Sequence, residues 1–524
     1  MINNVSWVDI TIFIIYNLLG VGIGFYVSRR KKGKQRSTSE YFLAGKTLPW
    51  WAVGAALIAA NISAEQLIGM CGSSYVIGIA VASYEWMSAL TLIIVAKFLL
   101  PVYLKNNIMT MPQFLEKRFD NRVRTSLAVF WLMLYVFINL TTVLYLGALF
   151  LNTVLGINMI VAILILVLFT ALYSIYGGLM AVAWTDVIHV FFLIAGGILV
   201  TVIALSHVSL GHSLFAGMKE MFMKAPEKFD LILSKNNKYY DKLPGISVLI
   251  GGMWLGNLSY WGFNQYVTQK AFAAKNLKEA QLGTMFAGYL KLLMPFIVVL
   301  PGIIAFVLKP DINPPDRAYP WLLSTFVPSG MKGITIGALF AAIVSALCSI
   351  TNSTATIFTM DIYKQFFKKE LTESHLVKVG RITSASALFV ATIIAIPLLS
   401  SLDQVFQFIQ DYNAYLSPLI VLIFGAGIFW KRTTANAVLW AAIATLPLSV
   451  GVKMIWPHMP FMNREVLILF ILLIIVAGIS YLEKQKQINS MVRIEKGWFH
   501  TSMGFNIGAI GICTILTVLY ILLW

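Results

Sequence analysis

The stretch Ala59-Ala60-Asn61-Ile62-Ser63-Ala64-Glu65-Gln66 places four polar residues in the middle of a long apolar segment. That segment, residues 50–73, is long enough to cross a hydrocarbon core of about 30 Å as a helix. Polar side chains and irregular backbone persist at this depth only where they meet protein or line a wet cavity. The stretch therefore predicts a helix that is broken near the middle of a membrane and faces the interior of a helix bundle.

A similar interruption occurs in the apolar segment 244–265, which contains Gly251-Gly252-Met253-Trp254-Leu255-Gly256-Asn257-Leu258-Ser259-Tyr260-Trp261. Two interrupted spans, one at the head of each of two five-helix halves, are typical of transporters built from inverted repeats. We expect residues 50–206 to form the first repeat and residues 244–430 the second.

Hydrophobic residues make up 59% of the 524-residue chain and charged residues only 12%, which is typical of an integral membrane protein. We expect one membrane domain over residues 1–524, with an additional first helix at 7–28 and three C-terminal helices within 434–524. The fourteen predicted spans lie near 7–28, 50–73, 76–103, 123–150, 157–177, 184–206, 244–265, 280–308, 334–360, 380–400, 405–430, 434–455, 464–484 and 504–524.

The net charge of +17 comes from basic residues in the joints between these spans, without the basic stripe and interleaved aromatic residues of a nucleic-acid-binding protein. The densest basic run, Arg29 to Arg36, follows the first span and should be cytoplasmic by the positive-inside rule. An even number of spans then places both termini outside. We expect a multi-pass protein of the plasma membrane, here a bacterial inner membrane, with no nucleic-acid partner.

Other motifs exclude several classes of protein. Gly45-Lys46-Thr47 resembles the end of a phosphate-binding loop, but Glu40 replaces the first glycine and no strand precedes it, so ATP-driven transport is not expected. Cys71, Cys348 and Cys513 lie in apolar segments without disulfide or metal-ligand spacing. The sequence therefore favours a transporter over an enzyme.

Two ionisable residues, Glu85 and Lys291, fall inside predicted spans. Each costs about 2.5–3.5 kcal/mol at the membrane centre, so they should face a cavity or each other. An ion pair that only joins helices is the alternative. The other polar residues at this depth are Gln66, Ser88, Asn257 and Gln410. Such a set of hydrogen-bonding groups suits a solute with several hydroxyls, such as a sugar.

Several motifs resemble those of the sodium:solute symporter family. They are Asn61-Ile62-Ser63-Ala64-Glu65-Gln66, Ser83-Tyr84-Glu85-Trp86, Tyr173-Ser174-Ile175-Tyr176-Gly177-Gly178-Leu179 and Trp184-Thr185-Asp186. Three others are similar to its sodium/glucose and sodium/galactose branch, namely Tyr260-Trp261-Gly262-Phe263-Asn264-Gln265-Tyr266, Asn352-Ser353-Thr354-Ala355-Thr356 and Asp361-Ile362-Tyr363. The resemblance runs from about residue 40 to 465. It implies an all-α sodium/leucine transporter fold, with one helix before a five-plus-five core and three after it.

The resemblance also implies roles for individual residues. The positions that would contact sugar are Gln66, Glu85, Ser88, Asn257, Lys291 and Gln410. Tyr260 would stack on the sugar as an inner gate, with Asn61 as its hydrogen-bond partner and Trp261 beside it. Met70, Tyr84 and Phe406 match an outer gate, although ordinary helix packing is the alternative for such residues.

By the same resemblance, sodium would be bound by the carbonyl oxygens of Ala59, Ile62 and Ala342 and by the hydroxyl of Ser345. Neutral oxygens at an unwound helix are the expected ligands for a coupling ion. Ala346 replaces a second hydroxyl that is common in the branch, which leaves ion affinity open.

Some relatives hold a second ion, which here would use Asp186 and Ser349. The third position is Cys348, a poor ligand for a hard cation. We expect one sodium ion per sugar, with a weak second site left open.

The sequence thus predicts a sodium-coupled symporter that imports galactose or glucose by alternating access. The alternative is a sodium- or proton-coupled symporter of another solute, such as myo-inositol, an amino acid or a carboxylate. A channel or membrane sensor of the same fold is less favoured, because a channel needs a continuous lined pore. Neither the particular hexose nor the oligomeric state follows from the sequence.

Overall fold

The computed structural model describes residues 5–27, 46–108, 110–209, 211, 213–367, 371–402, 404–483, 492 and 494–524, and only the backbone of residues 21, 23–27 and 173–184. Within these residues every regular element is a helix, and extended backbone pairs only at a single bridge between Leu48 and Ala274. The predicted all-α class is therefore confirmed. The basic run Arg29 to Arg36 lies outside the described residues.

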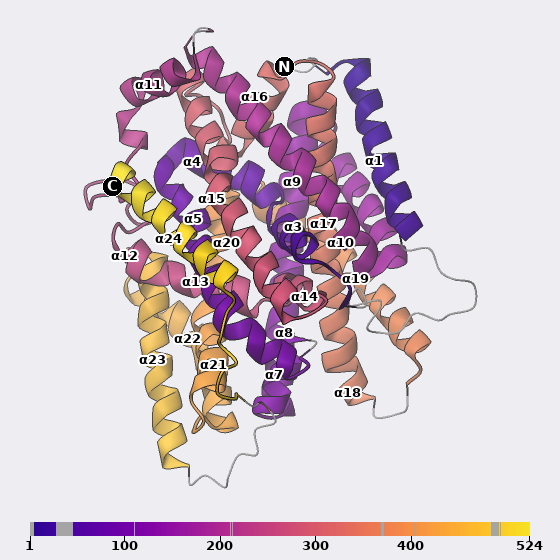
Figure 1. The fold of residues 1–524 in the computed structure, drawn as a ribbon, viewed down its shortest axis with the longest axis vertical. Helices are drawn as coiled ribbons and strands as arrows, with labels where there is room; N and C mark the ends of the chain where they lie inside the picture. The colour runs from indigo at the N-terminus through magenta and orange to yellow at the C-terminus, as the bar shows by residue number, and fades with distance from the viewer. Residues whose placement is uncertain are drawn as a thin grey trace.

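The chain folds into a bundle of helices (Figure 1). The first part contains α1 (Trp7–Val27), α3 (Trp50–Asn61), η2 (Glu65–Met70), α4 (Cys71–Ile77), η3 (Ile79–Val81), α5 (Ala82–Ile94), η4 (Val95–Leu99), α6 (Leu100–Lys105), α7 (Met111–Arg118), α8 (Asn121–Met133), η5 (Leu134–Leu140), α9 (Thr141–Leu155), α10 (Met159–Val208), α11 (Leu214–Lys224) and η6 (Pro226–Lys228). The second part contains α12 (Ser247–Ile250), α13 (Gly252–Phe263), α14 (Gln265–Phe272), α15 (Leu277–Leu308), η7 (Pro315–Arg317), α16 (Ala318–Phe326), α17 (Met331–Ile357), η8 (Phe358–Tyr363), α18 (Lys364–Phe366), α19 (Glu373–Leu399), α20 (Val405–Asn413), α21 (Ser417–Phe429), α22 (Ala435–Ile455), α23 (Phe461–Leu482) and α24 (Met503–Leu523).

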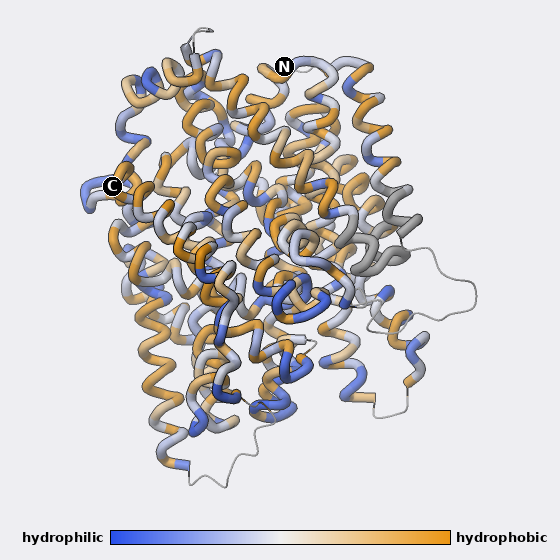
Figure 2. The backbone as a smooth tube through the Cα atoms, in the orientation of Figure 1, coloured by the Kyte–Doolittle hydropathy of each residue, from blue (hydrophilic) through white to orange (hydrophobic). Residues whose placement is uncertain are grey.

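Among the described residues, nine helical stretches are long and apolar enough to cross a membrane, and two bent helix pairs raise the number to eleven. Hydrophobic residues predominate along the helices, and hydrophilic residues gather mainly near helix ends and in connecting segments (Figure 2). The chain is therefore a multi-pass membrane protein.

The helix break predicted around Asn61 is present. α3 ends at Asn61, Ile62 is extended with φ −74° and ψ 99°, and α3 meets the η2–α4 segment at an angle of 59°. Side chains accept hydrogen bonds from backbone N–H groups freed at the break. Ser63 Oγ accepts the Glu65 N–H at 3.2 Å, and Gln66 Oε1 accepts the Ser63 N–H at 3.4 Å. Local polar residues thus stabilise the unwound segment from within.

The second predicted interruption is present at Gly251, the first residue of the quoted stretch, where α12 ends and α13 begins. α13 is a continuous helix through Gly252–Phe263, and the chain leaves helical geometry before it, at Gly251, and after it, at Asn264. A Cβ at Gly252 would lie 2.6 Å from the Cα of Met462, so this glycine allows close approach of α23 rather than a break. A further bend of 43°, which the sequence analysis did not predict, joins α20 to α21.

The predicted joint between spans 157–177 and 184–206 is also not seen, because both lie within the continuous helix α10. No proline occurs between residues 157 and 206, and an internal glycine costs a helix only about 1 kcal/mol relative to alanine. The Gly177-Gly178 pair is therefore insufficient to end the helix.

The first helix is anchored to α17, the helix that carries Ser345. The Asp9 carboxylate on α1 accepts the Gly330 N–H at 2.7 Å and the Gly333 N–H at 3.0 Å, at the amino end of α17. Free N–H groups and the helix dipole favour a negative charge at this position. α1 also packs along α10 and α17, so it supports one side of the bundle.

Candidate functional site

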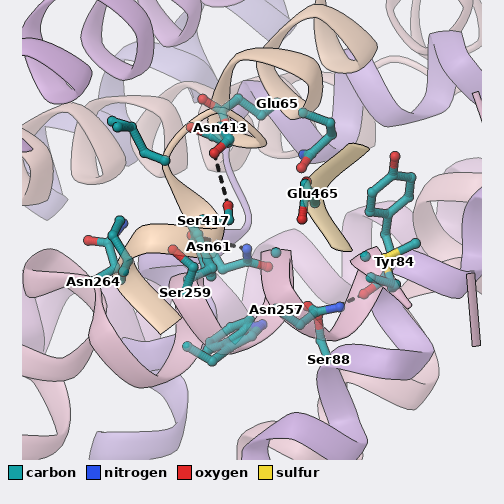
Figure 3. A pocket seen from close by; sticks show the side chains of 18 of the residues that line it. Asn61, Glu65, Tyr84, Ser88, Asn257, Ser259, Asn264, Asn413, Ser417 and Glu465 are labelled. Carbon is teal, nitrogen blue, oxygen red and sulfur yellow. Dashed lines mark hydrogen bonds between the residues drawn. The ribbon is translucent and has the colours of Figure 1, made fainter. Parts of the chain in front are cut away.

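A cavity lies beside the break in α3 and extends along α13 (Figure 3). Its walls come from α3 and η2, α5, the junction of α8 and η5, α13, the α20–α21 bend and the first two turns of α23. The predicted substrate and gate residues that line it are Asn61, Gln66, Met70, Tyr84, Glu85, Ser88, Asn257, Tyr260, Trp261, Phe406 and Gln410. The structure thus gathers, around one cavity, residues that are up to 349 positions apart in the sequence.

Lys291 does not line this cavity but lies behind its wall. The Lys291 Nζ atom is 2.5 Å from Glu85 Oε2 and also donates to Asn61 Oδ1. Lys291 is fully buried and its ammonium group lies 5.1 Å from the centre of the Trp261 ring. The lysine therefore balances the charge of Glu85 and orients two residues that do face the cavity.

Asn61, which accepts a hydrogen bond from Lys291, also contacts the predicted inner gate. Asn61 Nδ2 donates to the Tyr260 hydroxyl at 3.1 Å, which is the hydrogen bond expected from the sequence. Trp261 packs edge to face against Tyr260, with ring centres 5.1 Å apart. A continuous polar chain thus connects Glu85 on α5, through Lys291 and Asn61, to Tyr260 on α13.

Other cavity residues are held by equally specific contacts. Ser88 Oγ donates to Asn257 Oδ1 at 2.6 Å and is also 2.7 Å from the Tyr84 carbonyl, so the serine proton is shared between two acceptors (Figure 3). Tyr84 and Phe406 pack edge to face at 5.1 Å. These two rings, with the buried Met70, close one part of the cavity wall, where the sequence placed an outer gate.

The four residues expected to bind sodium are all buried. Ala59 and Ile62 flank the end of α3, whereas Ala342 and Ser345 lie on α17, which contacts α3. The Ser345 hydroxyl donates to Asp186 Oδ1. This bond uses the serine proton and leaves lone pairs of Ser345 Oγ for a cation.

Asp186 is already neutralised by a lysine. The Lys270 Nζ atom on α14 is 2.9 Å from Asp186 Oδ2, and both side chains are buried. Nearby, Cys348 Sγ donates to the Thr170 carbonyl at 3.6 Å, and the hydroxyl of Ser349 has no hydrogen-bond partner among the described residues. Both carboxylate oxygens of Asp186 are thus in use.

Several cavity residues were not predicted from the sequence. They are Glu65, Asn139, Ser259, Asn264, Asn413, Ser417 and Glu465. Glu65 lies in the quoted break motif and accepts from Thr142 Oγ1 at 3.2 Å. Asn264 lies where α13 ends, and its Oδ1 accepts from the Tyr135 hydroxyl at 2.5 Å. Polarity inside a span was the available signal for Glu65, whereas Asn413 and Glu465 lie near helix ends, where polar residues are unremarkable.

The sequence matches a known protein family. The model of the sodium:solute symporter family matches residues 41–445. A sodium/glucose cotransporter of Vibrio parahaemolyticus is 50% identical over 543 residues, which cover 100% of this chain and 99% of that protein. The human sodium/myo-inositol cotransporter 2 is 33% identical over 474 residues, which cover 84% of this chain and 69% of that protein.

Solved structures share the fold. The structure of a Na+-coupled sialic acid symporter in a substrate-bound, outward-open state matches with a TM-score of 0.79 and 23% identity, covering 92% of this chain and 100% of that chain. Mhp1, a nucleobase-cation-symport-1 family transporter in a closed conformation, matches with a TM-score of 0.59 and 14% identity, covering 87% of this chain and 98% of that chain. The family model and the relative from Vibrio parahaemolyticus show that the chain is an integral membrane transporter, not an enzyme. The chain belongs to the sodium:solute symporter family.

Removing either partner of the Lys291–Glu85 pair should destabilise the protein strongly. Lys291→Met and Glu85→Gln each leave a buried polar partner uncompensated, at a cost of about 3–5 kcal/mol for an unpaired charge. The double variant should lose clearly less stability than the sum of the single variants, because neither charge remains. Thermal unfolding in detergent measures these differences.

Lys453→Met is the control, because its ion pair with Asp411 is partly exposed, with 44% of the lysine side chain accessible. It should change the melting temperature much less. Strictly additive losses in the double variant would show that Lys291 and Glu85 do not interact.

Proposed function

We propose that this protein is a sodium-coupled symporter that imports a small neutral sugar, such as galactose or glucose, by alternating access. The observation that carries this proposal is the cavity at the helix break, where amides and hydroxyls gather around one charge-balanced pair. Glu85 is neutralised by Lys291, so together they add no net charge to the binding site. The sodium/glucose cotransporter of Vibrio parahaemolyticus, 50% identical over the whole chain, supports the same solute and ion.

In this proposal, Gln66, Glu85, Ser88, Asn257 and Gln410 bind the sugar hydroxyls directly. Lys291, which the sequence placed among them, acts through Glu85 and Asn61. Tyr260 and Trp261, with Asn61, form the inner gate, and the outer gate consists of Met70, Tyr84 and Phe406. Release to the cytoplasm then requires movement of Tyr260, which breaks its 3.1 Å hydrogen bond with Asn61.

Another polyol is the second candidate substrate. A more distant relative, the human sodium/myo-inositol cotransporter 2 at 33% identity, is named for the polyol myo-inositol. An amino acid or carboxylate is less favoured, because such a solute would need a free cation at the site. Lys291 is paired with Glu85, and Arg464, next to the cavity residue Glu465, is paired with Asp411.

We also propose fourteen spans, with inverted repeats at residues 50–206 and 244–430 and both termini outside. Within the part of the chain that the structure describes, eleven spans qualify by length and composition when the bent pairs are counted. α1 and α13 supply two more. The fourteenth span requires the 50-residue α10, which the structure shows as one continuous helix, to divide into two crossings of about 20 residues. The resulting topology places the first helix and the last three outside the repeats.

One sodium ion per sugar is proposed to bind at Ala59, Ile62, Ala342 and Ser345. Lys270 supports this stoichiometry, because its ammonium group donates a hydrogen bond to the Asp186 carboxylate that a second ion would need as a ligand. Cys348 is engaged with the Thr170 carbonyl and is a soft ligand. Asp186 then acts by orienting the Ser345 hydroxyl toward the ion.

Counterflow in proteoliposomes tests the transport function. Unlabelled galactose or glucose inside the vesicles should drive uptake of the labelled sugar when sodium is present, and replacement of sodium by potassium should abolish it. Gln66→Ala should weaken sugar transport by roughly 1–3 kcal/mol, or about 5- to 150-fold, because it strands buried hydrogen-bonding partners. Failure of every sugar in a panel of hexoses and polyols to exchange would refute the proposal.

The reversal potential tests the stoichiometry. One charge moving through about 100 mV supplies roughly 2.3 kcal/mol, and a tenfold sodium gradient adds about 1.4 kcal/mol. One ion therefore supports about 500-fold accumulation of a neutral sugar, and two ions support on the order of 200,000-fold. Measured at fixed gradients in sealed vesicles, the ratio should be one sodium per sugar, and a ratio of two would contradict the argument from Lys270 and Cys348.

A further inference from the structure

The helix α23 follows the proposed repeats in the chain, yet its first turn forms part of the central cavity. Phe461, Met462 and Glu465 all line it. The contact is close, because a Cβ at Gly252 would lie 2.5 Å from the Met462 carbonyl oxygen. The helices after residue 430 therefore contribute to the site rather than only surrounding it.

Glu465 is an unusual member of this wall. The residue is only 3% exposed, and its Oε2 atom has no hydrogen-bond partner among the described residues. Figure 3 shows its carboxyl group directed into the pocket. A buried carboxyl oxygen without a partner is costly, so this oxygen should find one when the cavity is filled.

The neighbouring basic groups are committed elsewhere. Arg464 pairs with Asp411 on α20 at 2.5 Å, and Lys453 on α22 pairs with the same carboxylate at 2.9 Å. Glu85, by contrast, has Lys291. Glu465 thus presents a carboxyl group to the cavity without an ion pair within the part of the chain that the structure describes.

We propose that the carboxyl group of Glu465 hydrogen-bonds substrate hydroxyls at the end of the cavity near Gly252. This inference rests on the proposed sugar-transport function and deepens it. Gly252 precedes Asn257 by five residues, about 7.5 Å along α13. Asn257 and Glu465 line the same cavity, and the unpartnered oxygen of Glu465 can accept a proton from a sugar hydroxyl held there.

Counterflow with purified full-length protein tests this role, with galactose as the substrate. Glu465→Leu should raise the apparent KM for galactose about tenfold, because the hydrogen bond to the sugar is lost. Glu465→Gln keeps a carbonyl acceptor at the same position and should stay within about threefold of the parental KM.

Asn463→Ala is the matched control, since Asn463 lies in the same turn of α23 and is not among the cavity residues. It should retain the parental KM. A parental KM in Glu465→Leu, with the melting temperature unchanged or lowered, would overturn the inference and leave sugar transport intact. Absence of sugar exchange in the parent protein would overturn the transport function and this inference with it.

Discussion

The unwinding of the chain between Asn61 and Glu65 is the constraint on which the site depends. Backbone groups freed inside a membrane protein cannot bond to lipid, so they need partners from the protein, from water or from a ligand. Ser63 and Gln66 satisfy part of this need locally. Asn61, the last helical residue, contacts both Lys291 and Tyr260. The break therefore sets the positions of the cavity wall and of the proposed inner gate together.

Charge balance across the two halves of the chain is the second organising feature. Glu85 on α5 pairs with Lys291 on α15, and Asp186 on α10 pairs with Lys270 on α14. Each buried pair joins residues 50–206 to residues 244–430. Buried ion pairs contribute little net stability, but they are costly to break. Here the two pairs fix the relative position of residues 50–206 and 244–430, because a motion that separated these segments at the pairs would leave buried charges uncompensated.

Polar residues in the middle of predicted membrane spans explain why much of the cavity lining could be predicted from the sequence. Asn61, Glu85 and Asn257 are expensive in lipid, and the structure places all three at the cavity. The same reasoning predicted that Lys291 would be internal, but it could not distinguish a residue that faces the cavity from one that supports its wall. That difference depends on side-chain direction, which the spacing of spans does not specify.

Other features could not be predicted for identifiable reasons. A glycine signals either a break or a close approach, and at Gly252 the close approach of Met462 decided the outcome. The Gly177-Gly178 pair suggested a joint, yet α10 continues through it. Glu465 lies in the first turns of α23, where an acidic residue is common at a membrane surface. Only the packing of α23 against α13 shows that this position is internal.

We propose that the break around Ile62 couples sodium binding to sugar binding. Equilibrium binding of labelled galactose to the purified protein across a sodium titration, with potassium keeping ionic strength constant, tests this coupling. Galactose should bind more tightly as sodium rises, and the half-saturating sodium concentration should fall reciprocally as galactose rises. Equal galactose affinity in sodium and in potassium would contradict the coupling.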